Sequence, residues 1–393
     1  MSQSIDNIGK ISKLEYFVMF LAICISGNPL FIYAETKFLY VVMVILLFVM
    51  CAMRGKALIN KHFRSWALGS ILLFVLQYVF VELTSIAADI NFLARLYIAF
   101  LTASFLGYKF RETYLRVMIL ICAVSLVFFS INITTGIEFG IVVDRYYSIL
   151  LYNSILGGTR NSGMFWEPGA FQGFIMLVPL LFSNQLKQLW KKHKSGCVIL
   201  LIALLTTQST TGYIAFASFF FLTILVNGKI SNMLKGVLLS ISVIGFIYMW
   251  TQDFMGEKIT EQYEHAQNMQ KGEISWDRLS VMYIDFYNIK RHPFIGNGFM
   301  DEARYGIWGE YMRGAGNGFT GAMNMFGIPF MFLFFISLFR NLSYVPITNR
   351  LIFIFIVVLL LNGEYFLNYP LFWSLLFVKI PKNEIDSSII NRS

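Results

Sequence analysis

Residues 38–53 read FLYVVMVILLFVMCAM, a run without a single charged side chain, and Arg54 and Lys56 follow it directly. A transmembrane helix needs about 20 mainly apolar residues. The 393-residue chain holds several such runs, because 57% of its residues are hydrophobic and only 13% are charged. Soluble domains average about 45–50% apolar and about 25% charged residues. The composition therefore predicts an all-α polytopic membrane protein and excludes an ordinary soluble enzyme.

Apolar runs recur along the whole chain. They lie at 16–34, 38–53, 66–83, 90–107, 117–133, 170–185, 197–211, 213–227, 237–252, 317–339, 351–367 and 369–380. We therefore expect about 12 transmembrane helices (10–12) in a single integral membrane domain covering residues 1–393. The first run follows a polar start and precedes no small-residue cleavage pattern, which predicts a retained span and not a signal peptide.

The distribution of charge predicts the orientation. With the N-terminus in the cytoplasm, 20 of the 31 Lys and Arg residues fall in inner segments, and 17 of the 22 acidic residues fall outside. Both termini are then cytoplasmic, and two long loops, at about 134–169 and 253–316, lie outside and form the expected active-site face. The net charge of +9 is thus a topology signal, which favours anionic membrane lipids as partners and no nucleic acid.

The first outer loop ends in the sequence GGTRNSGMFWEPG at 157–169, and an apolar run begins directly afterwards. Pro168 suits the first position of a helix, so Glu167 lies at a helix N-terminus, where a carboxylate is favoured. Glu167 is then either a helix cap or a carboxylate held at the membrane surface, as a general base or as a partner for Arg160. Arg160 is either an interface anchor or a phosphate-binding group, because its glycine-rich surroundings permit close approach and guanidinium binds phosphate oxygens in a bidentate manner.

The second outer loop contains WDRLSVMYIDFYNIK at 276–290. Its aromatic residues recur at three- and four-residue steps, which predicts an amphipathic helix with an aromatic face lying in the membrane interface. Arg278, Ser280, Asp285 and Asn288 fall largely off that face. We expect them to point towards whatever binds in the loop.

The tetrapeptide Gly-Asn-Gly-Phe occurs twice, at 296–299 and 316–319. Asn-Gly is foremost a turn signal, but the backbone N–H groups of such a segment near a helix N-terminus also suit an anion. Arg291, just before the first copy, and Asn317, within the second, are therefore further candidates for binding a phosphate. His292 is either a solvated loop residue or a second candidate for the general base.

Two shorter motifs lie at the ends of apolar runs. Residues 209–212 read STTG and predict a hairpin whose hydroxyls satisfy loose backbone or contact a sugar or phosphate. Glu364, in the sequence NGEY at 362–365, is costly to place in so apolar a segment, and we expect it to pair with an outer-loop arginine.

The chain lacks the signatures of metal and nucleotide chemistry. Its four cysteines are far apart, and no cysteine–histidine spacing, HExxH motif or carboxylate cluster predicts a metal centre. No phosphate-binding Walker loop is present either. We expect a reaction without metal or cofactor, on a substrate that is already activated at the outer face.

The order of these motifs resembles the O-antigen polymerase/ligase superfamily of bacterial envelope glycan enzymes. The resemblance rests on Arg160 before GMFWEP, on the STTG hairpin, on Arg278 followed by PFIGNG at 293–298, and on Asn317 ahead of FGIP at 326–329. It covers about residues 150–335 in motifs and the whole chain in topology.

The resemblance implies a multi-pass enzyme of the bacterial inner membrane. Such an enzyme moves an oligosaccharide from undecaprenyl pyrophosphate onto an acceptor hydroxyl at the periplasmic face, in O-antigen or capsule biosynthesis. Outer-loop arginines of the family bind the pyrophosphate, which assigns that role to Arg160 and Arg278. Glu167 is then the first candidate for the base and His292 the second. The family also implies a chain-length regulator and a flippase as partners.

Three functions compete. A polymerase joins one lipid-linked repeat unit to another, whereas a ligase delivers the finished chain to lipid A–core. The ligase pattern places a histidine just before the asparagine that opens the late span, and this chain has Gly316 there, which favours the polymerase. A flippase or transporter of lipid-linked oligosaccharide is less favoured, because the two halves show no convincing repeat and few charges lie deep in the apolar runs.

Overall fold

The computed structural model describes most of the chain between residues 11 and 378. Outside the described residues lie 1–10, 33–36, 144–145, 156–158, 227, 229–230, 238–239, 241–246, 248–250, 252–255, 270–276, 307–316, 344 and 379–393. The expected span at 237–252 falls mostly there, as do Trp276 and Gly316.

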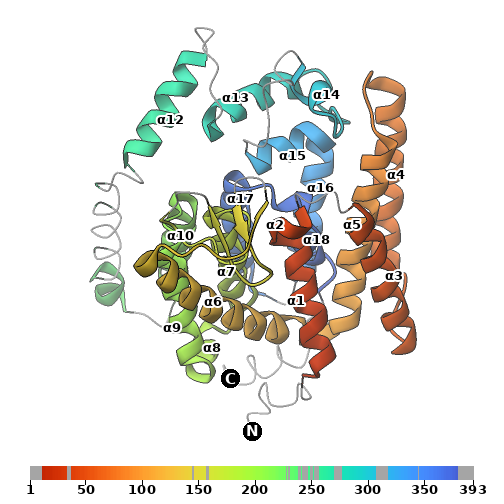
Figure 1. Cartoon of the computed structure of the whole chain (residues 1–393). Helices are drawn as coiled ribbons and strands as arrows, with labels where there is room; N and C mark the ends of the chain where they lie inside the picture. Colours follow the sequence, from red (N-terminus) through yellow and green to blue (C-terminus); the bar gives the residue numbers. More distant parts are fainter. Residues whose placement is uncertain are drawn as a thin grey trace.

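The described part is mostly helical (Figure 1). Its first helices are α1 (Lys13–Gly27), α2 (Pro29–Ile32), α3 (Lys37–Met53), α4 (Lys61–Phe80), α5 (Ile86–Leu106), η2 (Gly107–Lys109), α6 (Phe110–Thr135), α7 (Pro168–Leu181), α8 (Leu186–Lys192), α9 (Lys194–Thr206) and α10 (Thr210–Val226). The later ones are α12 (Gly256–Met269), α13 (Arg278–Ile289), α14 (Asp301–Tyr305), α15 (Gly318–Phe326), α16 (Ile328–Asn341), α17 (Ile347–Gly363), η4 (Phe366–Asn368) and α18 (Pro370–Ser374).

Side-chain caps explain where several helices begin. Ser12 and Glu15 form a capping box at the start of α1. Asp277 accepts hydrogen bonds from the first N–H groups of α13, and Asn317 does the same for α15. These short polar side chains satisfy N–H groups that the first turn of a helix leaves unpaired.

Two described helical stretches, Lys61–Phe80 and Ile86–Thr135, are long and apolar enough to cross a membrane. Two bent helix pairs would raise the number to four if each pair is one span. They are α7 with α8, bent by 107°, and α15 with α16, bent by 117°. Other predicted spans are apolar helices of 10–17 residues, such as α9, α10 and α17, at or below the usual lower limit for crossing. The apolar helices favour a membrane protein, and the count of about 12 spans stays a prediction.

An exposed apolar face along α3 and α4 supports contact with lipid. Its members are Val41, Ile45, Phe48, Val49, Leu68, Leu72, Val75 and Val79. The two helices lie at the same edge of the molecule (Figure 1). Extensive apolar surface of this kind is rare where a protein faces water.

Glycine produces the sharp bend between α15 and α16. Gly327 has a φ of +82°, which a residue with a side chain rarely adopts. Gly296, with a φ of +71°, packs its backbone against the carbonyl of Met325, and a Cβ there would overlap that carbonyl. The apolar run at 317–339 therefore forms two helices instead of one continuous span.

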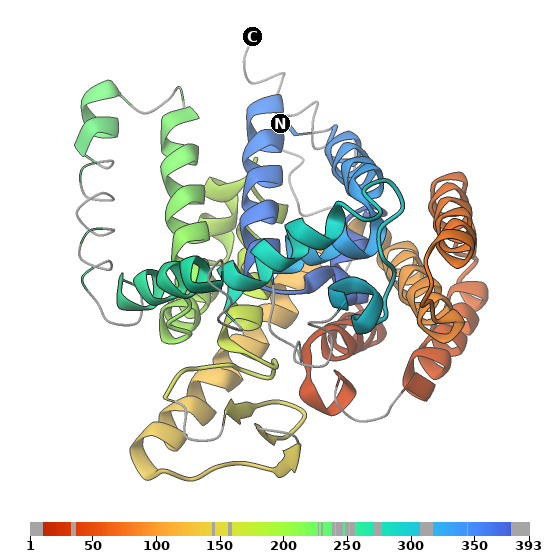
Figure 2. The ribbon, with the colours of Figure 1, turned by 90° about the horizontal axis from the view of Figure 1, so that it is seen from above.

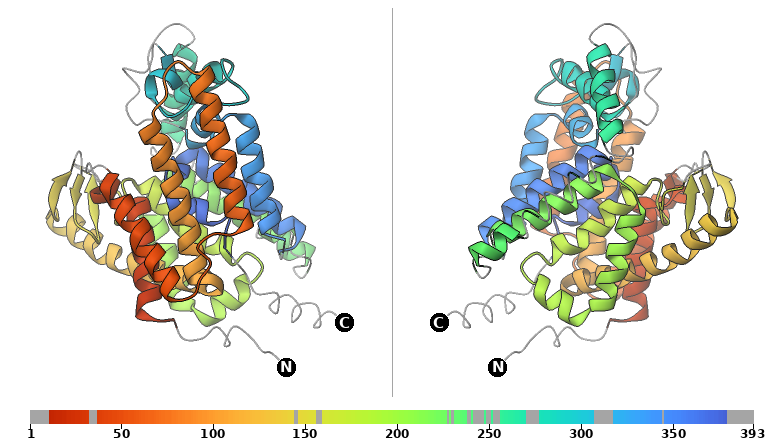
Figure 3. Two further views of the ribbon diagram at one scale, coloured as in Figure 1. Left: turned by 90° about the vertical axis from the view of Figure 1, so that its right-hand side faces the viewer. Right: turned by 90° about the vertical axis from the view of Figure 1, so that its left-hand side faces the viewer.

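A small antiparallel sheet corrects the expectation of an all-α fold. It consists of β1 (Ile141–Val143), β2 (Tyr146–Ser148) and β3 (Asn153–Ile155), in the order β1-β2-β3. The sheet projects from one side of the molecule next to α6 (Figure 3). It belongs to the first predicted outer loop, where the composition contains no apolar run.

Charged residues gather where α1 begins, at the end of the molecule opposite α13 and α14 (Figure 1). Glu15 forms ion pairs with Arg54 at 3.5 Å and Lys109 at 3.2 Å. Glu112 does the same with Arg116 at 2.9 Å. The charge pattern assigns all of these residues to the cytoplasmic side. Their proximity is consistent with that assignment, and the topology itself stays a prediction.

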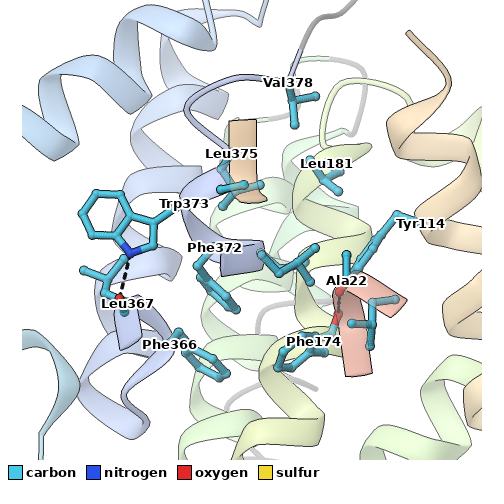
Figure 4. Close-up of a cluster of buried hydrophobic side chains, with 14 of the residues drawn as sticks. Ala22, Tyr114, Phe174, Leu181, Phe366, Leu367, Phe372, Trp373, Leu375 and Val378 are labelled. Carbon is cyan, nitrogen blue, oxygen red and sulfur yellow. Dashed lines mark hydrogen bonds between the residues drawn. The ribbon is translucent and has the colours of Figure 1, made fainter. Parts of the chain in front are cut away.

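A buried aromatic core joins α1, α6, α7 and the C-terminal segment (Figure 4). The Tyr114 hydroxyl donates to the carbonyl of Phe174 at 2.7 Å, and the Trp373 indole donates to the carbonyl of Leu367 at 2.7 Å. The ring of Phe366 packs so closely on α7 that a Cβ at Gly173 would overlap it. This packing holds the segment after α17 against the N-terminal half of α7.

Candidate functional site

Two chain segments far apart in sequence converge at the N-terminus of α7. Arg160 comes from the loop before α7, Glu167 is the N-cap of α7, and Arg278 is the first residue of α13. The guanidinium of Arg160 lies within electrostatic range of both Glu167 and Arg278. Three of the residues singled out in the sequence are thus neighbours, although 118 positions separate the first from the last.

Arg278 is held by two groups from other helices. Its Nη2 donates to Glu364 Oε1 at 2.7 Å, and its Nη1 donates to Thr211 Oγ1 at 3.1 Å. The expectation that Glu364 pairs with an outer-loop arginine is confirmed. Thr211 belongs to the STTG motif at the start of α10, so one function of that motif here is to support Arg278.

Glu364 lies in the centre of the site, just after the end of α17. Its second oxygen accepts a hydrogen bond from the indole N–H of Trp166 at 3.3 Å, and its carboxyl is in hydrogen-bonding contact with Glu167. The guanidinium of Arg278 and the carboxyl group of Glu167 thus face Glu364 from two sides. A hydrogen bond between two carboxyl groups needs a proton on one of them, so Glu364 and Glu167 can act together as a pair.

Arg160 is fixed by the turn between α9 and α10. Its Nε donates to the carbonyl of Thr207 at 3.1 Å, while the next residue, Asn161, donates from its backbone N–H to the carbonyl of Thr206 at 3.0 Å. Burial lowers the pKa of the Arg160 guanidinium, and the carboxylates of the two acids oppose that shift. A guanidinium stays charged at physiological pH, so the site holds two fixed cations beside two acids.

Gly169 makes this arrangement possible. It is the second residue of α7, and a Cβ at this position would overlap Glu364 Oε1 and lie 3.4 Å from Arg278 Nη2. The Glu364–Arg278 pair thus occupies the space next to the helix backbone that a side chain would fill.

Arg291 and His292 lie elsewhere. They follow the far end of α13, which has 12 residues, so about 18 Å of helix separates them from Arg278. Arg291 donates from Nη2 to the carbonyls of Ala303 at 2.8 Å and Arg304 at 3.2 Å. Neither residue therefore belongs to the cluster formed by Arg160, Glu167, Gly169, Arg278 and Glu364. Arg291 instead tethers α14.

The first Gly-Asn-Gly-Phe segment is a turn. Its backbone N–H groups already donate to carbonyls, from Asn297 to Asn324 at 2.7 Å and from Gly298 to Met325 at 3.2 Å. These N–H groups are therefore not available to bind an anion, which is one of the two possibilities that the sequence offers.

The second Gly-Asn-Gly-Phe segment opens α15. Asn317 caps this helix and donates from its side-chain amide to Asn362 Oδ1 at 2.8 Å. Asn362 lies two residues before Glu364, so Asn317 supports the backbone that carries this acid.

The orientation of α13 also differs from expectation. The aromatic side chains of Tyr283, Phe286 and Tyr287 are exposed, as predicted for an interfacial helix. The polar face, in contrast, is buried against protein, since Asp285 accepts hydrogen bonds from Thr320 at 2.7 Å and from Asn324 at 2.8 Å. This face attaches α13 to α15, and the N-terminus of α13 reaches the cluster (Figure 2).

Two members of the cluster, Glu364 and Gly169, are not among the site residues that the sequence predicts. The sequence signal for Glu364 is a single acidic residue in an apolar segment. Such a residue needs a positively charged partner, but the sequence does not show which arginine that is. Across the described residues, no group of three or more His, Cys, Asp or Glu side chains is placed to hold a metal ion. A reaction without metal stays a prediction.

The comparison with known proteins adds a family. Residues 195–325 match the family model described as O-antigen ligase, which supports the superfamily that the motifs indicate. The matched segment contains Thr211 and Arg278, whereas Arg160, Glu167 and Glu364 lie outside it. No curated protein and no solved structure matches the chain.

Proposed function

We propose that this chain, whose residues 195–325 match the O-antigen ligase family model, is an oligosaccharide repeat-unit polymerase. It would transfer a growing glycan from undecaprenyl pyrophosphate onto another lipid-linked repeat unit at the periplasmic face. The observation that carries the proposal is the convergence of Arg160, Arg278 and two acids at the N-terminus of α7.

The two arginines suit the leaving group of this reaction. As the bond between sugar C1 and the pyrophosphate oxygen breaks, negative charge grows on the phosphate. Guanidinium groups that are already fixed in a poorly hydrated place stabilise such charge without reorganising. Thr211 and the carbonyl of Thr207 hold Arg278 and Arg160 in this way.

The acids suit the acceptor. Its hydroxyl must lose a proton as it attacks C1, and a positioned base contributes about 10²–10⁴-fold to the rate. Glu167 is the first candidate because it lies beside the arginines, whereas His292 lies at the far end of α13. Arg160 and Arg278 are proposed as the pyrophosphate-binding groups, and the role of Asn317 is to support the backbone before the second acid.

A ligase is the second candidate, because the matched family model is described as O-antigen ligase. Gly316, at the position where the ligase pattern has histidine, favours the polymerase. The remaining parts of the proposal are about 12 spans, cytoplasmic termini, an active-site face built from 134–169 and 253–316, and a location in the bacterial inner membrane. A chain-length regulator and a flippase would be its partners.

A surface-glycan gel from a strain that lacks the protein tests the function. Short glycan capped with one repeat unit, with the ladder lost, is the result expected for a polymerase. Bare lipid A–core with polymer still on its lipid carrier would assign the ligase function instead. Lipid-linked units trapped on the cytoplasmic side would indicate a flippase, and an unchanged gel would redirect the search to capsule.

Glu167→Gln is expected to lower the rate of glycan transfer about 10²-fold while binding of the lipid-linked donor is retained. The amide keeps the size of the side chain but accepts no proton. Turnover and donor binding are measured on purified protein in lipid nanodiscs. If turnover stayed normal, Glu167 would have no part in the transfer.

Gly169→Ala is expected to lower glycan transfer about tenfold, because its Cβ overlaps Glu364 Oε1 and displaces the pair with Arg278. Gly69→Ala is the matched control, since a Cβ at that position of α4 meets nothing within 4 Å. Polymer length and protein level are compared for both variants in the deletion strain. Equal activity of the two variants would show that the close packing at Gly169 has no functional consequence.

A further inference from the structure

The ion pair between Arg278 and Glu364 has an accessible side and a buried side. The side chain of Arg278 is 26% exposed, whereas that of Glu364 is 7% exposed. A ligand that arrives from outside therefore meets the guanidinium before it meets the carboxyl.

Glu364 binds the guanidinium of Arg278 in the way that a phosphate would. A carboxylate oxygen and a phosphate oxygen accept the same charge-assisted hydrogen bond from guanidinium, at similar distances. The 2.7 Å contact between Arg278 Nη2 and Glu364 Oε1 thus fills one of the positions that a phosphate oxygen would take.

Other groups hold Glu364 in place without Arg278. The indole of Trp166 donates to its second oxygen, and Glu167 contacts its carboxyl. The open side of Gly169 receives its first oxygen. Glu364 can therefore lose its bond to Arg278 and still remain ordered beside Glu167.

Arg278 likewise keeps an anchor when it leaves Glu364. Thr211 Oγ1 binds its other terminal nitrogen at 3.1 Å, and this contact comes from a different helix. Arg160 lies within electrostatic range of the same place. A diphosphate that displaces the carboxylate would thus find two guanidinium groups, one of them still held by Thr211.

We propose that Glu364 is a positioning residue that occupies Arg278 in the absence of substrate and is replaced there by the diphosphate of the donor. This inference rests on the proposed function and deepens it, because binding of the donor would then make Glu167 a stronger base. Once Arg278 has turned to the diphosphate, Glu364 and Glu167 remain in contact and need no further rearrangement to act as a pair.

The coupling follows from the charges that face the acid pair. While Arg278 is bound to Glu364, its positive charge favours the ionised carboxylate and weakens it as a proton acceptor. When the diphosphate takes over Arg278, that cation is neutralised and the proton affinity of the pair rises. The base thus becomes stronger at the moment when the donor is in place.

The transfer step forms one bond at sugar C1 and breaks another. The acceptor O–H proton moves to the carboxylate of Glu167, which Glu364 contacts, and the acceptor oxygen forms a bond to sugar C1. The bond between C1 and the pyrophosphate oxygen breaks, and its electron pair stays on the phosphate. Arg160 and Arg278 stabilise the charge that this oxygen acquires.

The test compares Glu364→Gln with the wild-type chain, both full length and in lipid nanodiscs, with undecaprenyl pyrophosphate as the binding probe. The variant is expected to bind the probe about tenfold more tightly, because the competing carboxylate is gone. Its turnover of lipid-linked repeat units is expected to fall about 10²-fold. Glu302→Gln, an exposed acid on α14, is the matched control and should change neither value.

Opposite changes in binding and turnover separate this role from a merely structural one. If Glu364 only supported Arg278, the variant would bind the probe more weakly, and equal or weaker binding overturns the inference. If the wild-type chain itself bound the probe no better than Arg278→Ala, the proposed function would fail instead.

A measurement on the wild-type chain covers the case in which Glu364→Gln does not fold. Infrared difference spectra recorded on addition of undecaprenyl pyrophosphate should show a change in the band of a protonated carboxyl group, because the acid pair loses its contact with Arg278. Arg278→Ala should lack this change. An unaltered band in wild-type protein that binds the probe would overturn the inference.

Discussion

Arg278→Ala is expected to lower glycan transfer about 10³-fold. Loss of one fixed donor to a developing negative charge costs about 10²–10³-fold. Here the substitution also removes the partner of a buried acid, since Glu364 Oε1 accepts from Arg278 Nη2 at 2.7 Å. Turnover of lipid-linked repeat units in nanodiscs measures the effect.

Arg278→Lys should recover little of this activity. An ammonium group cannot reproduce the planar fork that reaches Glu364 and Thr211 with two separate nitrogens. Lys290→Ala, an exposed cation at the other end of α13, is the matched control and should keep wild-type turnover. Normal polymer from Arg278→Ala at normal protein level would remove Arg278 from the site.

Asp285→Ala is expected to lower the free energy of unfolding by about 2–6 kcal/mol, because it leaves two buried donors unsatisfied at about 1–3 kcal/mol each. Asp285 is fully buried and accepts hydrogen bonds from Thr320 and Asn324. The cation that faces it, Arg304, is only 6% exposed. Without Asp285, Thr320 and Asn324 lose a buried acceptor, and Arg304 loses a nearby negative charge.

Unfolding by SDS in mixed micelles, followed by circular dichroism, measures the loss. Asp301→Ala is the control, because the side chain of Asp301 is 54% exposed and its carboxylate lies 3.8 Å from Arg304. Because Asp301 is solvent-exposed, its pair with Arg304 contributes about 0–1 kcal/mol. Equal stability of the two variants would contradict a structural role for the Asp285 network.

The part of the site that the sequence predicts consists of residues next to clear backbone signals. Pro168 marks the start of α7, so the place of Glu167 as its N-cap follows directly. The periodicity of 276–290 predicts α13, whose N-terminus carries Arg278. That these two ends meet depends on packing between distant segments, and a single sequence contains no direct signal for it.

The differences between these expectations and the structure have physical causes. Arg291 and His292 belong to the same predicted loop as Arg278, but an intervening helix separates them from it. The polar face of α13 is predicted to meet a ligand, since polar residues on an amphipathic helix usually face away from the protein core. In this chain the face packs on α15, where Asp285 finds its donors.

The number of membrane spans cannot be predicted from composition alone. Apolar residues predict burial in lipid or protein, whereas the path of the backbone depends on single residues such as Gly327. Its positive φ divides one apolar run into α15 and α16, which are bent by 117°. The segment after α6 contains no strand pattern strong enough to predict β1–β3, because each strand has only three residues.

The bond between Arg278 and Glu364 spans 86 positions in the chain. Ribosomes add about 5–20 residues per second, so Arg278 leaves the ribosome roughly 4–17 s before its carboxylate does. During synthesis both arginines are therefore present before the acid that occupies one of them. The segment that follows α17 thus completes the cluster, and a nascent chain lacks its full set of groups until Glu364 has been synthesised.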